Sequence, residues 1–133
     1  MKTFYPIITT PMLAECRDFY VHVLGAKVLF QKDWYVHLVI EGGEIGFLHP
    51  KRPARLPVFQ HATLTRGMCL ALEVKDVRRL HDDLQANNVK IFGALQEYPG
   101  GELAFSLLDP TGTVINIVEC IEDAPVVPDV LEI

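Results

Sequence analysis

Two polar side chains stand in the middle of apolar stretches that have the composition of strands. His37 lies in "WYVHLVI" and Asn116 lies in "TVINIVE". A neutral imidazole can donate a hydrogen bond with one nitrogen and accept one with the other, and it can transfer protons near neutral pH. An amide in a buried strand must find hydrogen-bond partners. Each residue is therefore either a satisfied polar group in the core or part of a sheet face that looks onto something else.

Strand alternation groups further candidates with these two. Neighbouring residues of a strand point to opposite faces, and in several segments one alternate set is apolar and is expected to lie against helices. That set comprises Phe4, Ile8, Leu70, Leu72, Ile115 and Ile117. The opposite set comprises Tyr5, Thr9, Cys69, Ser106 and Asn116, joined either by Tyr35 and His37 or by Trp34, depending on register. We expect the second set to mark the face that carries a binding site.

Each candidate also has an ordinary structural interpretation. Tyr5 and Tyr35 fit half-buried strand aromatics, and Glu44 could face the same site from the start of its strand. Cys69 is more typical of a small buried thiol than of a nucleophile, because nothing near it in sequence supplies a base or a cation. His37 is the best single candidate for a group that contacts a ligand or transfers a proton. The other histidines are expected to be superficial or structural: His22, His49, His61 and His81.

Composition and charge argue against several classes of function. The chain has 133 residues, 50% hydrophobic and 22% charged, with a formal net charge of -5, which fits one globular domain. It has no basic run, so we expect no nucleic-acid partner. No apolar run approaches the ~20 residues that span a bilayer, and "MKTFYPIITTPM" lacks the apolar stretch of a signal peptide. We therefore expect a cytoplasmic protein without a membrane partner.

Cysteines and short motifs suggest no cofactor. Cys16, Cys69 and Cys120 are odd in number and have no C-x-x-C spacing, so neither a disulfide framework nor a structural zinc site is predicted. Reduced thiols packed as small hydrophobes are expected instead. The chain has no G-x-S-x-G elbow, no P-loop and no G-x-G-x-x-G after a strand.

The elements that must position the candidates begin with a strand at 3–9, rich in aromatic and β-branched residues. Thr10 as N-cap and Pro11 at the first helical position predict a helix, which Gly25 should end. Strands follow at 27–32, 34–41 and 44–49, with a hairpin turn at Gly42 and Gly43 between the last two.

The same order then recurs after a segment with three prolines and no sustained period. It predicts a strand at 68–74, a helix at 77–88 after the N-cap Asp76, and strands at 90–95, 102–109 and 113–119, the last two joined by the turn "DPTG". "GAKVLF" echoes "NNVKIF", and "VIEGGEIGFLH" echoes "LLDPTGTVINIVE". We predict an α+β domain of two βαβββ modules, at about 1–50 and 67–120, with a Pro-rich linker at 51–66 and an acidic tail at 121–133.

With these residues in view, the chain resembles the vicinal oxygen chelate superfamily of glyoxalase I, extradiol dioxygenases and bleomycin-binding proteins. "RDFYVHVLGAKV" is similar to the family signature F-Y-x-x-x-L-G, and "DPTGTVINIVE" is similar to its closing D-P-x-G-x-x-I-E-L-x-E. The resemblance covers Phe4 to Glu119. It implies that the two modules form a cupped mixed sheet around a site. Many reactions occur on this scaffold, so activity must be argued from the site.

Metal-dependent members of that superfamily bind a divalent cation with His and Glu side chains from the first and last strands of each module. Alignment on the two motifs puts these positions at Tyr5, at Glu44 or Gly46, at Cys69 and at Asn116. Only Glu44 is a plausible hard ligand, and the internal repeat pairs Asn116 with Gly46 more naturally than with Glu44. The resemblance therefore implies a cup without a tightly held metal.

The expected function is binding of a small organic molecule without a cofactor, as in the bleomycin-binding branch, where sequestration needs no catalyst. The alternatives are a metal-dependent lyase or dioxygenase, and a non-catalytic interaction dimer. A homodimer is expected in each case, because bare edge strands are an aggregation liability. The expected ligand-lining residues are Tyr5, Tyr35, His37, Glu44, Cys69, Ser106 and Asn116.

Overall fold

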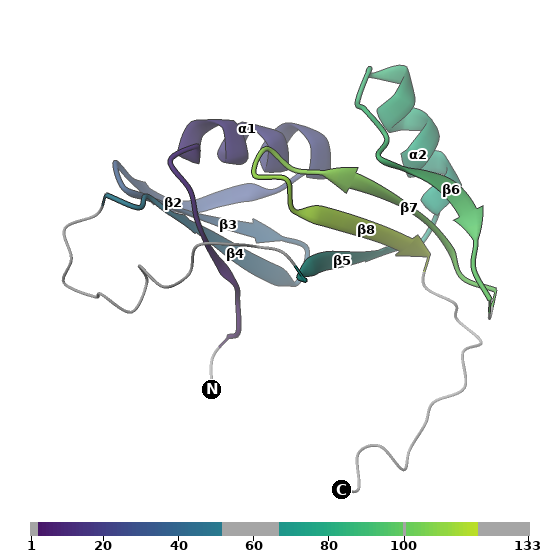
Figure 1. Cartoon of the computed structure of the whole chain (residues 1–133), viewed down its shortest axis with the longest axis horizontal. Coiled ribbons are helices and arrows are strands. Elements are labelled where there is room, and N and C mark those ends of the chain that lie inside the picture. The colour runs from purple at the N-terminus through teal and green to yellow at the C-terminus, as the bar shows by residue number, and fades with distance from the viewer. Residues whose placement is uncertain (1–2, 52–66, 100, 120–133) are drawn as a thin grey trace, which may run out of the picture.

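The two halves of the chain fold into modules with the same order of elements (Figure 1). A computed structural model describes residues 3–51, 67–99 and 101–119. The first module contains β1 (Ile7–Thr9), α1 (Leu13–Leu24), β2 (Lys27–Lys32), β3 (Tyr35–Ile40) and β4 (Gly43–Leu48). The second contains β5 (Cys69–Val74), α2 (Val77–Ala86), β6 (Gly93–Glu97), β7 (Leu103–Leu108) and β8 (Val114–Glu119).

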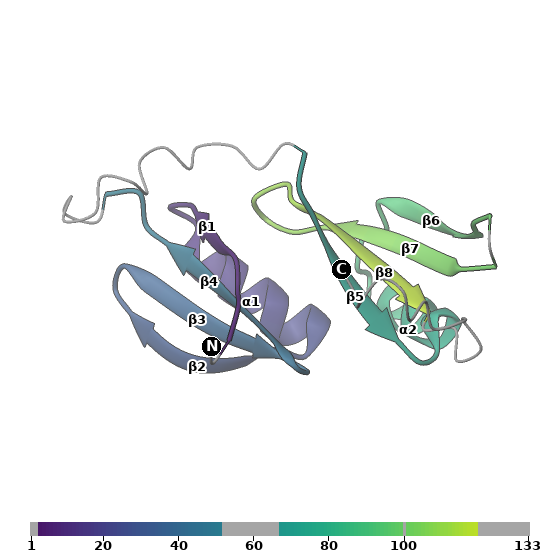
Figure 2. The ribbon, with the colours of Figure 1, turned by 90° about the horizontal axis from the view of Figure 1, so that it is seen from below.

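Each module forms a four-stranded mixed sheet, with orders β1-β4-β3-β2 and β5-β8-β7-β6. The first strand of each module runs parallel to the last, and the other pairs are antiparallel. Figure 2 shows the sheets side by side, with β1 and β5 at adjoining edges and β2 and β6 outermost. The predicted α+β fold of two βαβββ modules is confirmed.

Both helices lie on the same side of the molecule and cover one face of each sheet (Figure 1). The apolar alternation supplies the core beneath them, and Tyr20 of α1 packs on Phe47 with ring centroids 5.2 Å apart. The predicted inward positions of Ile8, Ile115 and Ile117 are confirmed, because all three are buried. The predicted inward position of Phe4 is wrong, because its side chain is 87% exposed. We call the other face of each sheet, which carries no helix, the open face.

The ends of the helices follow local chemistry, with one correction. Gly25 ends α1 in the left-handed conformation (φ 72°), and the Asp76 side chain caps α2 by accepting from the Arg79 N–H at 3.1 Å, as predicted. The predicted start of α1 at Thr10 and Pro11 is wrong by two residues, because Met12 is the N-cap. The Thr10 hydroxyl accepts from the Met12 N–H at 3.1 Å, which extends the turn before the helix.

Two predicted strand ends are also corrected. The predicted strand at 3–9 begins only at Ile7, because Pro6 has no N–H for the ladder. The predicted strand at 90–95 is found as β6, from Gly93 to Glu97. The hairpin turn lies at residues 41–42 rather than at Gly42 and Gly43, and Glu41 takes the positive φ of 49°.

The predicted "DPTG" turn between β7 and β8 forms, with Gly112 at φ 84° and the Asp109 N–H donating to the Thr113 carbonyl at 3.0 Å. Its aspartate also reaches the first module, because the Tyr20 hydroxyl donates to Asp109 Oδ2 at 2.6 Å. A buried hydrogen bond therefore joins α1 to the turn of the second module.

Several expectations fall on residues outside the described ranges. They concern the Pro-rich linker beyond Lys51, His61, Cys120 and the acidic tail. Within the described ranges, the helices are too short to cross a bilayer.

Candidate functional site

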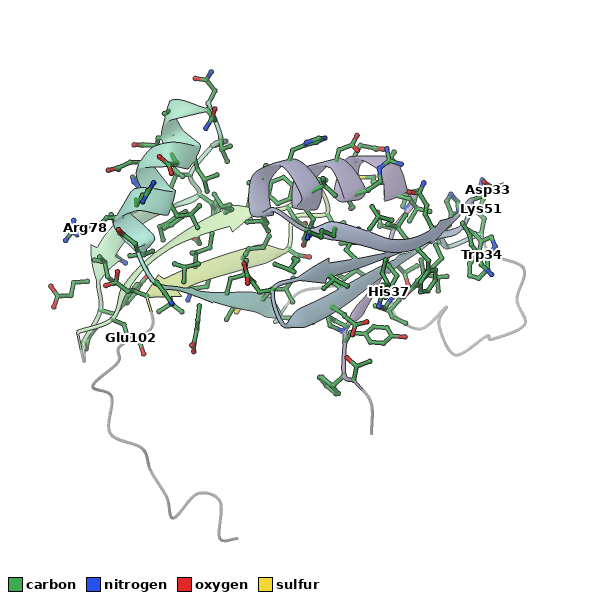
Figure 3. All side chains as sticks on the ribbon, turned by 180° about the vertical axis from the view of Figure 1, so that it is seen from behind. Asp33, Trp34, His37, Lys51, Arg78 and Glu102 are labelled. Carbon is green, nitrogen blue, oxygen red and sulfur yellow. The ribbon has the colours of Figure 1, made fainter. Side chains whose placement is uncertain are left out.

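The open face of the first sheet carries the candidate aromatic and imidazole side chains. The register pairs Phe30 with His37 and His37 with Gly46, and Tyr35 follows the same alternation as His37. Tyr35 and His37, rather than Trp34, therefore lie on this face, and Trp34 falls in the turn before β3. Figure 3 shows His37 on the side of the sheet away from α1.

A hydrogen-bonded chain of three side chains runs across this face. Tyr35 Oη lies 2.7 Å from His37 Nδ1, and His37 Nε2 lies 2.6 Å from Glu44 Oε1. A carboxylate oxygen only accepts, so Nε2 must carry a proton. In the neutral ring, Nδ1 is then the acceptor, and the Tyr35 hydroxyl donates to it. Both imidazole nitrogens of His37 thus have hydrogen-bond partners, Tyr35 and Glu44.

Aromatic rings cover the imidazole from two directions. The Phe30 ring stacks on His37 with centroids 5.1 Å apart and planes within 3°, and Tyr5 meets it edge-on at 4.5 Å. His37 is only 2% exposed, whereas Phe30 is 47% and Tyr5 37% exposed. A ligand approaching from solvent would meet the two rings and Glu44 before the imidazole.

Gly46 makes room for this arrangement. A Cβ at position 46 would collide with the Tyr35 hydroxyl and lie 2.7 Å from Tyr35 Cζ. The phenol thus fills the space in which a longer side chain of residue 46 would begin. Tyr35 and Gly46 are consequently interdependent, although eleven positions separate them in the sequence.

Two pKa values reflect these contacts. The pKa of Glu44 is lowered, first by the hydrogen bond from His37 and then by that from the Thr3 hydroxyl, which lies 2.9 Å from Oε2. Burial, followed by interactions with Tyr5 and Glu44, raises the pKa of Tyr35 to about 12. The carboxylate therefore stays ionised and the phenol stays protonated at neutral pH.

We expect the Tyr35 phenol to make stability depend on pH in the alkaline range. An unfolded tyrosine ionises near pH 10 and folded Tyr35 near 12, so the unfolded chain loses its proton first as the pH rises. The contribution of Tyr35 to the free energy of unfolding is therefore intact below pH 10. It is lost between pH 10 and pH 12, by at most about 3 kcal/mol. Urea unfolding at about pH 8 and about pH 11.5 should show a larger loss for wild type than for Tyr35→Phe. Equal losses would contradict this.

The open face of the second sheet has a different character. Its central row runs Ala71, Asn116, Ser106 and Gly93 across the four strands. Cys69 follows the same alternation at the start of β5, and its thiol is exposed, which corrects the expectation of a buried cysteine. Cys16 is buried as expected, and burial raises the pKa of its thiol to about 12.

The structure therefore separates the candidate residues into two groups. Tyr5, Tyr35, His37 and Glu44 meet on the first sheet, whereas Cys69, Ser106 and Asn116 lie on the open face of the second. Phe30 and Thr3 also contact this group, although neither was among the predicted residues. Phe30 could not be assigned by alternation, because a bulge between Val28 and Phe30 shifts the register of β2.

The donors present do not fit a divalent cation of the His and Glu type. In the described parts of the chain, no group of three His, Cys, Asp or Glu side chains lies close enough to hold a metal ion. Glu44 already accepts hydrogen bonds from His37 and Thr3. Gly46 offers no side chain, and the phenol of Tyr35 occupies the space beside it.

Known structures share this fold. A lactoylglutathione lyase from Agrobacterium tumefaciens aligns at 16% identity and a TM-score of 0.73, over 90% of this chain and 94% of that one. A bleomycin-binding protein in complex with bleomycin aligns at 16% identity and a TM-score of 0.66, over 91% and 100%. A glyoxalase/bleomycin resistance protein/dioxygenase family enzyme from Burkholderia phytofirmans aligns at 20% identity and a TM-score of 0.74, over 88% of this chain and 97% of that one. These similarities establish the fold alone.

Family membership rests on the sequence. A search of curated proteins finds no match. The model of the glyoxalase/bleomycin resistance protein/dioxygenase superfamily matches residues 4–117, which is most of the chain. The chain therefore belongs to the glyoxalase/bleomycin resistance protein/dioxygenase superfamily.

Proposed function

We propose that the protein binds a small organic molecule on the open face of its first sheet, without a tightly held metal. The observation that carries this proposal is the half-exposed ring of Phe30, which stacks on the buried imidazole of His37. Apolar and aromatic walls with a few placed polar groups are typical of small-molecule sites. Glu44, whose side chain is 23% exposed, supplies a carboxylate beside these rings.

Sequestration of a ligand suits this arrangement better than metal chemistry. The structural neighbours include both a lyase and a bleomycin-binding protein, so the fold does not choose between catalysis and binding. A metal-dependent lyase or dioxygenase would need anionic or imidazole donors with free lone pairs, and His37 and Glu44 are hydrogen-bonded to each other. A site that binds by ring contacts and one carboxylate requires neither.

Phe30 provides the direct test, because the internal repeat supplies a matched control. Phe92 ends the segment that echoes the one ending at Phe30, and it is also exposed. The best ligand from a panel of small aromatic compounds and antibiotics would be titrated by calorimetry. Phe30→Ala should weaken binding about tenfold, as expected for loss of one ring contact, and Phe92→Ala should have little effect. Equal effects of the two changes would argue against the first sheet as the site.

Absence of a stoichiometric metal is a second expectation. Protein purified after growth with nickel, zinc, manganese and iron should hold far less than one equivalent of each by elemental analysis. Asn116→Glu alone should not create a metal site, because one added carboxylate leaves no free imidazole in the set. One equivalent of metal that survives dialysis would favour the enzyme alternative.

We also propose that the protein forms a homodimer. Among the described strands, the outermost ones, β2 and β6, each have a partner on one side only, and bare edges of this kind favour association with another chain. Light scattering at tens of micromolar protein should give twice the mass of the chain. A monomer under these conditions would remove this proposal and leave the site on the first sheet unaffected.

A further inference from the structure

Residues 3–5 cross the open face of the first sheet without belonging to it. We call this segment the strap. The strand β1 begins at Ile7. Just before it, the Gly46 N–H of β4 donates a hydrogen bond to the Pro6 carbonyl at 3.0 Å. Proline has no N–H to continue the pairing. The strap is therefore joined to the sheet by side chains rather than by a backbone ladder.

Two side-chain contacts hold the strap over the site. The Thr3 hydroxyl donates to Glu44 Oε2 at 2.9 Å, and the Tyr5 ring meets the His37 ring edge-on at 4.5 Å. Thr3 and Tyr5 are both exposed, so each contact is partly in water. Contacts of this kind change an equilibrium constant by about two- to tenfold. The strap can therefore leave the face at moderate cost, with Pro6 at its root.

Departure of the strap would expose a site of definite chemistry. His37 would lose its contact with the Tyr5 ring, Glu44 would have a free carboxylate oxygen, and Phe30 would still stack on the imidazole. The strap fills this site with an aromatic ring and a hydroxyl donor. A molecule that carries both groups could replace both contacts at once.

Charges on this face favour a neutral ligand. By strand register, Lys27 lies beside Val39, which in turn pairs with Glu44. Lys32 also lies on this face, with its ammonium group 5.4 Å from the Trp34 ring centroid. One carboxylate and two ammonium groups give no excess of negative charge to select a cation, and the Glu44 carboxylate at the point of contact disfavours an anion.

We propose that the strap occupies the ligand position, and that the ligand which displaces it is a neutral aromatic molecule with a hydrogen-bond donor, such as a phenol. This inference rests on the proposed function, because it names the ligand class for the same site. The donor is directed at Glu44 Oε2 in place of Thr3, and the ring is directed at the imidazole of His37 in place of Tyr5.

The test uses variants of the strap and two matched probes. 4-Methylphenol has a ring and a donor, and 4-methylanisole has the ring without the donor. Affinities would be measured by NMR titration, following the imidazole signals of His37. Tyr5→Ala should bind 4-methylphenol about fivefold more tightly than wild type, and Thr3→Val about twofold. 4-Methylanisole should bind more weakly than 4-methylphenol to each of these proteins, because it cannot donate to Glu44. Tyr98→Ala, a change of a similarly exposed tyrosine in the second module, should alter neither affinity.

Weaker or unchanged binding of 4-methylphenol to Tyr5→Ala would contradict the proposal that the strap occupies the ligand position. Equal affinities of 4-methylanisole and 4-methylphenol for wild type would overturn the donor requirement. Neither result would affect the proposed function, which is tested separately by comparing Phe30→Ala with Phe92→Ala. Saturating wild type with 4-methylphenol gives a readout that does not depend on a variant. Saturation should abolish the nuclear Overhauser contact between the Tyr5 and His37 rings. Persistence of that contact in the bound state would also contradict the proposal that the ligand displaces the strap.

Discussion

Asp109→Ala is expected to lower the free energy of unfolding by about 3 to 5 kcal/mol, because it leaves several buried donors without an acceptor. Asp109 is only 4% exposed. Its Oδ1 accepts from the N–H groups of Thr111 and Thr113, at 2.8 and 3.0 Å, and from the Thr111 hydroxyl at 2.6 Å. Its Oδ2 accepts from the Tyr20 hydroxyl. The carboxylate therefore holds the turn together and ties it to α1.

Two further variants separate these roles. Tyr20→Phe removes only the bond between the modules and should cost about 1 to 2 kcal/mol. Burial and then Asp109 raise the pKa of Tyr20, so the phenol remains a donor throughout the accessible pH range. Asp82→Ala, in an exposed pair with His81, is the control and should change stability by about 0.5 kcal/mol or less. Urea unfolding measures all three. A loss for Asp109→Ala no larger than that for Asp82→Ala would show that the carboxylate is dispensable.

The fold could be predicted because its signals are local and occur twice. Gly25 and Asp76 act through their own backbone neighbourhood, as does the turn at Asp109, and the strands alternate regularly. The contact between Asp109 and Tyr20 was not predictable in the same way. It joins residues 89 positions apart, and only the packing of α1 against the second module brings them together. Local sequence patterns therefore predicted the turn but not its partner.

The candidate site was predictable only where strand alternation held. Tyr35 and His37 lie on the expected face because β3 is regular. Phe30 was missed because the bulge in β2 breaks the alternation, and Phe4 was misplaced because Pro6 ends the ladder before it. Burial was the other source of error. Cys69 was expected to be buried, yet it starts β5, an edge strand that pairs with β8 alone among the described strands.

The backbones of the two modules repeat, but their open faces do not. In the first sheet, Gly46 leaves a space that the Tyr35 phenol fills, and aromatic rings continue the cover. In the second sheet the central row has small or polar side chains, and the Ser106 hydroxyl takes the space beside Gly93. A glycine thus accommodates a hydroxyl in both modules, but only the first module adds an imidazole and a carboxylate. This difference is why we assign the ligand to the first sheet.

Gly46→Ala should be almost as damaging as Asp109→Ala, with an expected loss of about 2 to 4 kcal/mol. The added methyl group would collide with the Tyr35 hydroxyl, and residue 46 is buried in β4 between β1 and β3. Movement of the phenol would remove its hydrogen bond to His37 Nδ1. The cost combines overpacking with an unsatisfied buried imidazole nitrogen.

Gly42→Ala provides the matched control, because no other atom lies within 4 Å of a Cβ at that position. It should leave stability within about 0.5 kcal/mol of wild type.

The double variant Gly46→Ala with Tyr35→Phe removes the clashing hydroxyl together with the glycine. Because Tyr35 Cζ would still lie 2.7 Å from the new methyl carbon, recovery should be partial. The double variant should nevertheless cost less than the sum of the single changes, by about 1 kcal/mol or more. Strictly additive losses in urea unfolding would mean that Gly46 and Tyr35 act independently, and that the glycine does not serve to seat the phenol against His37.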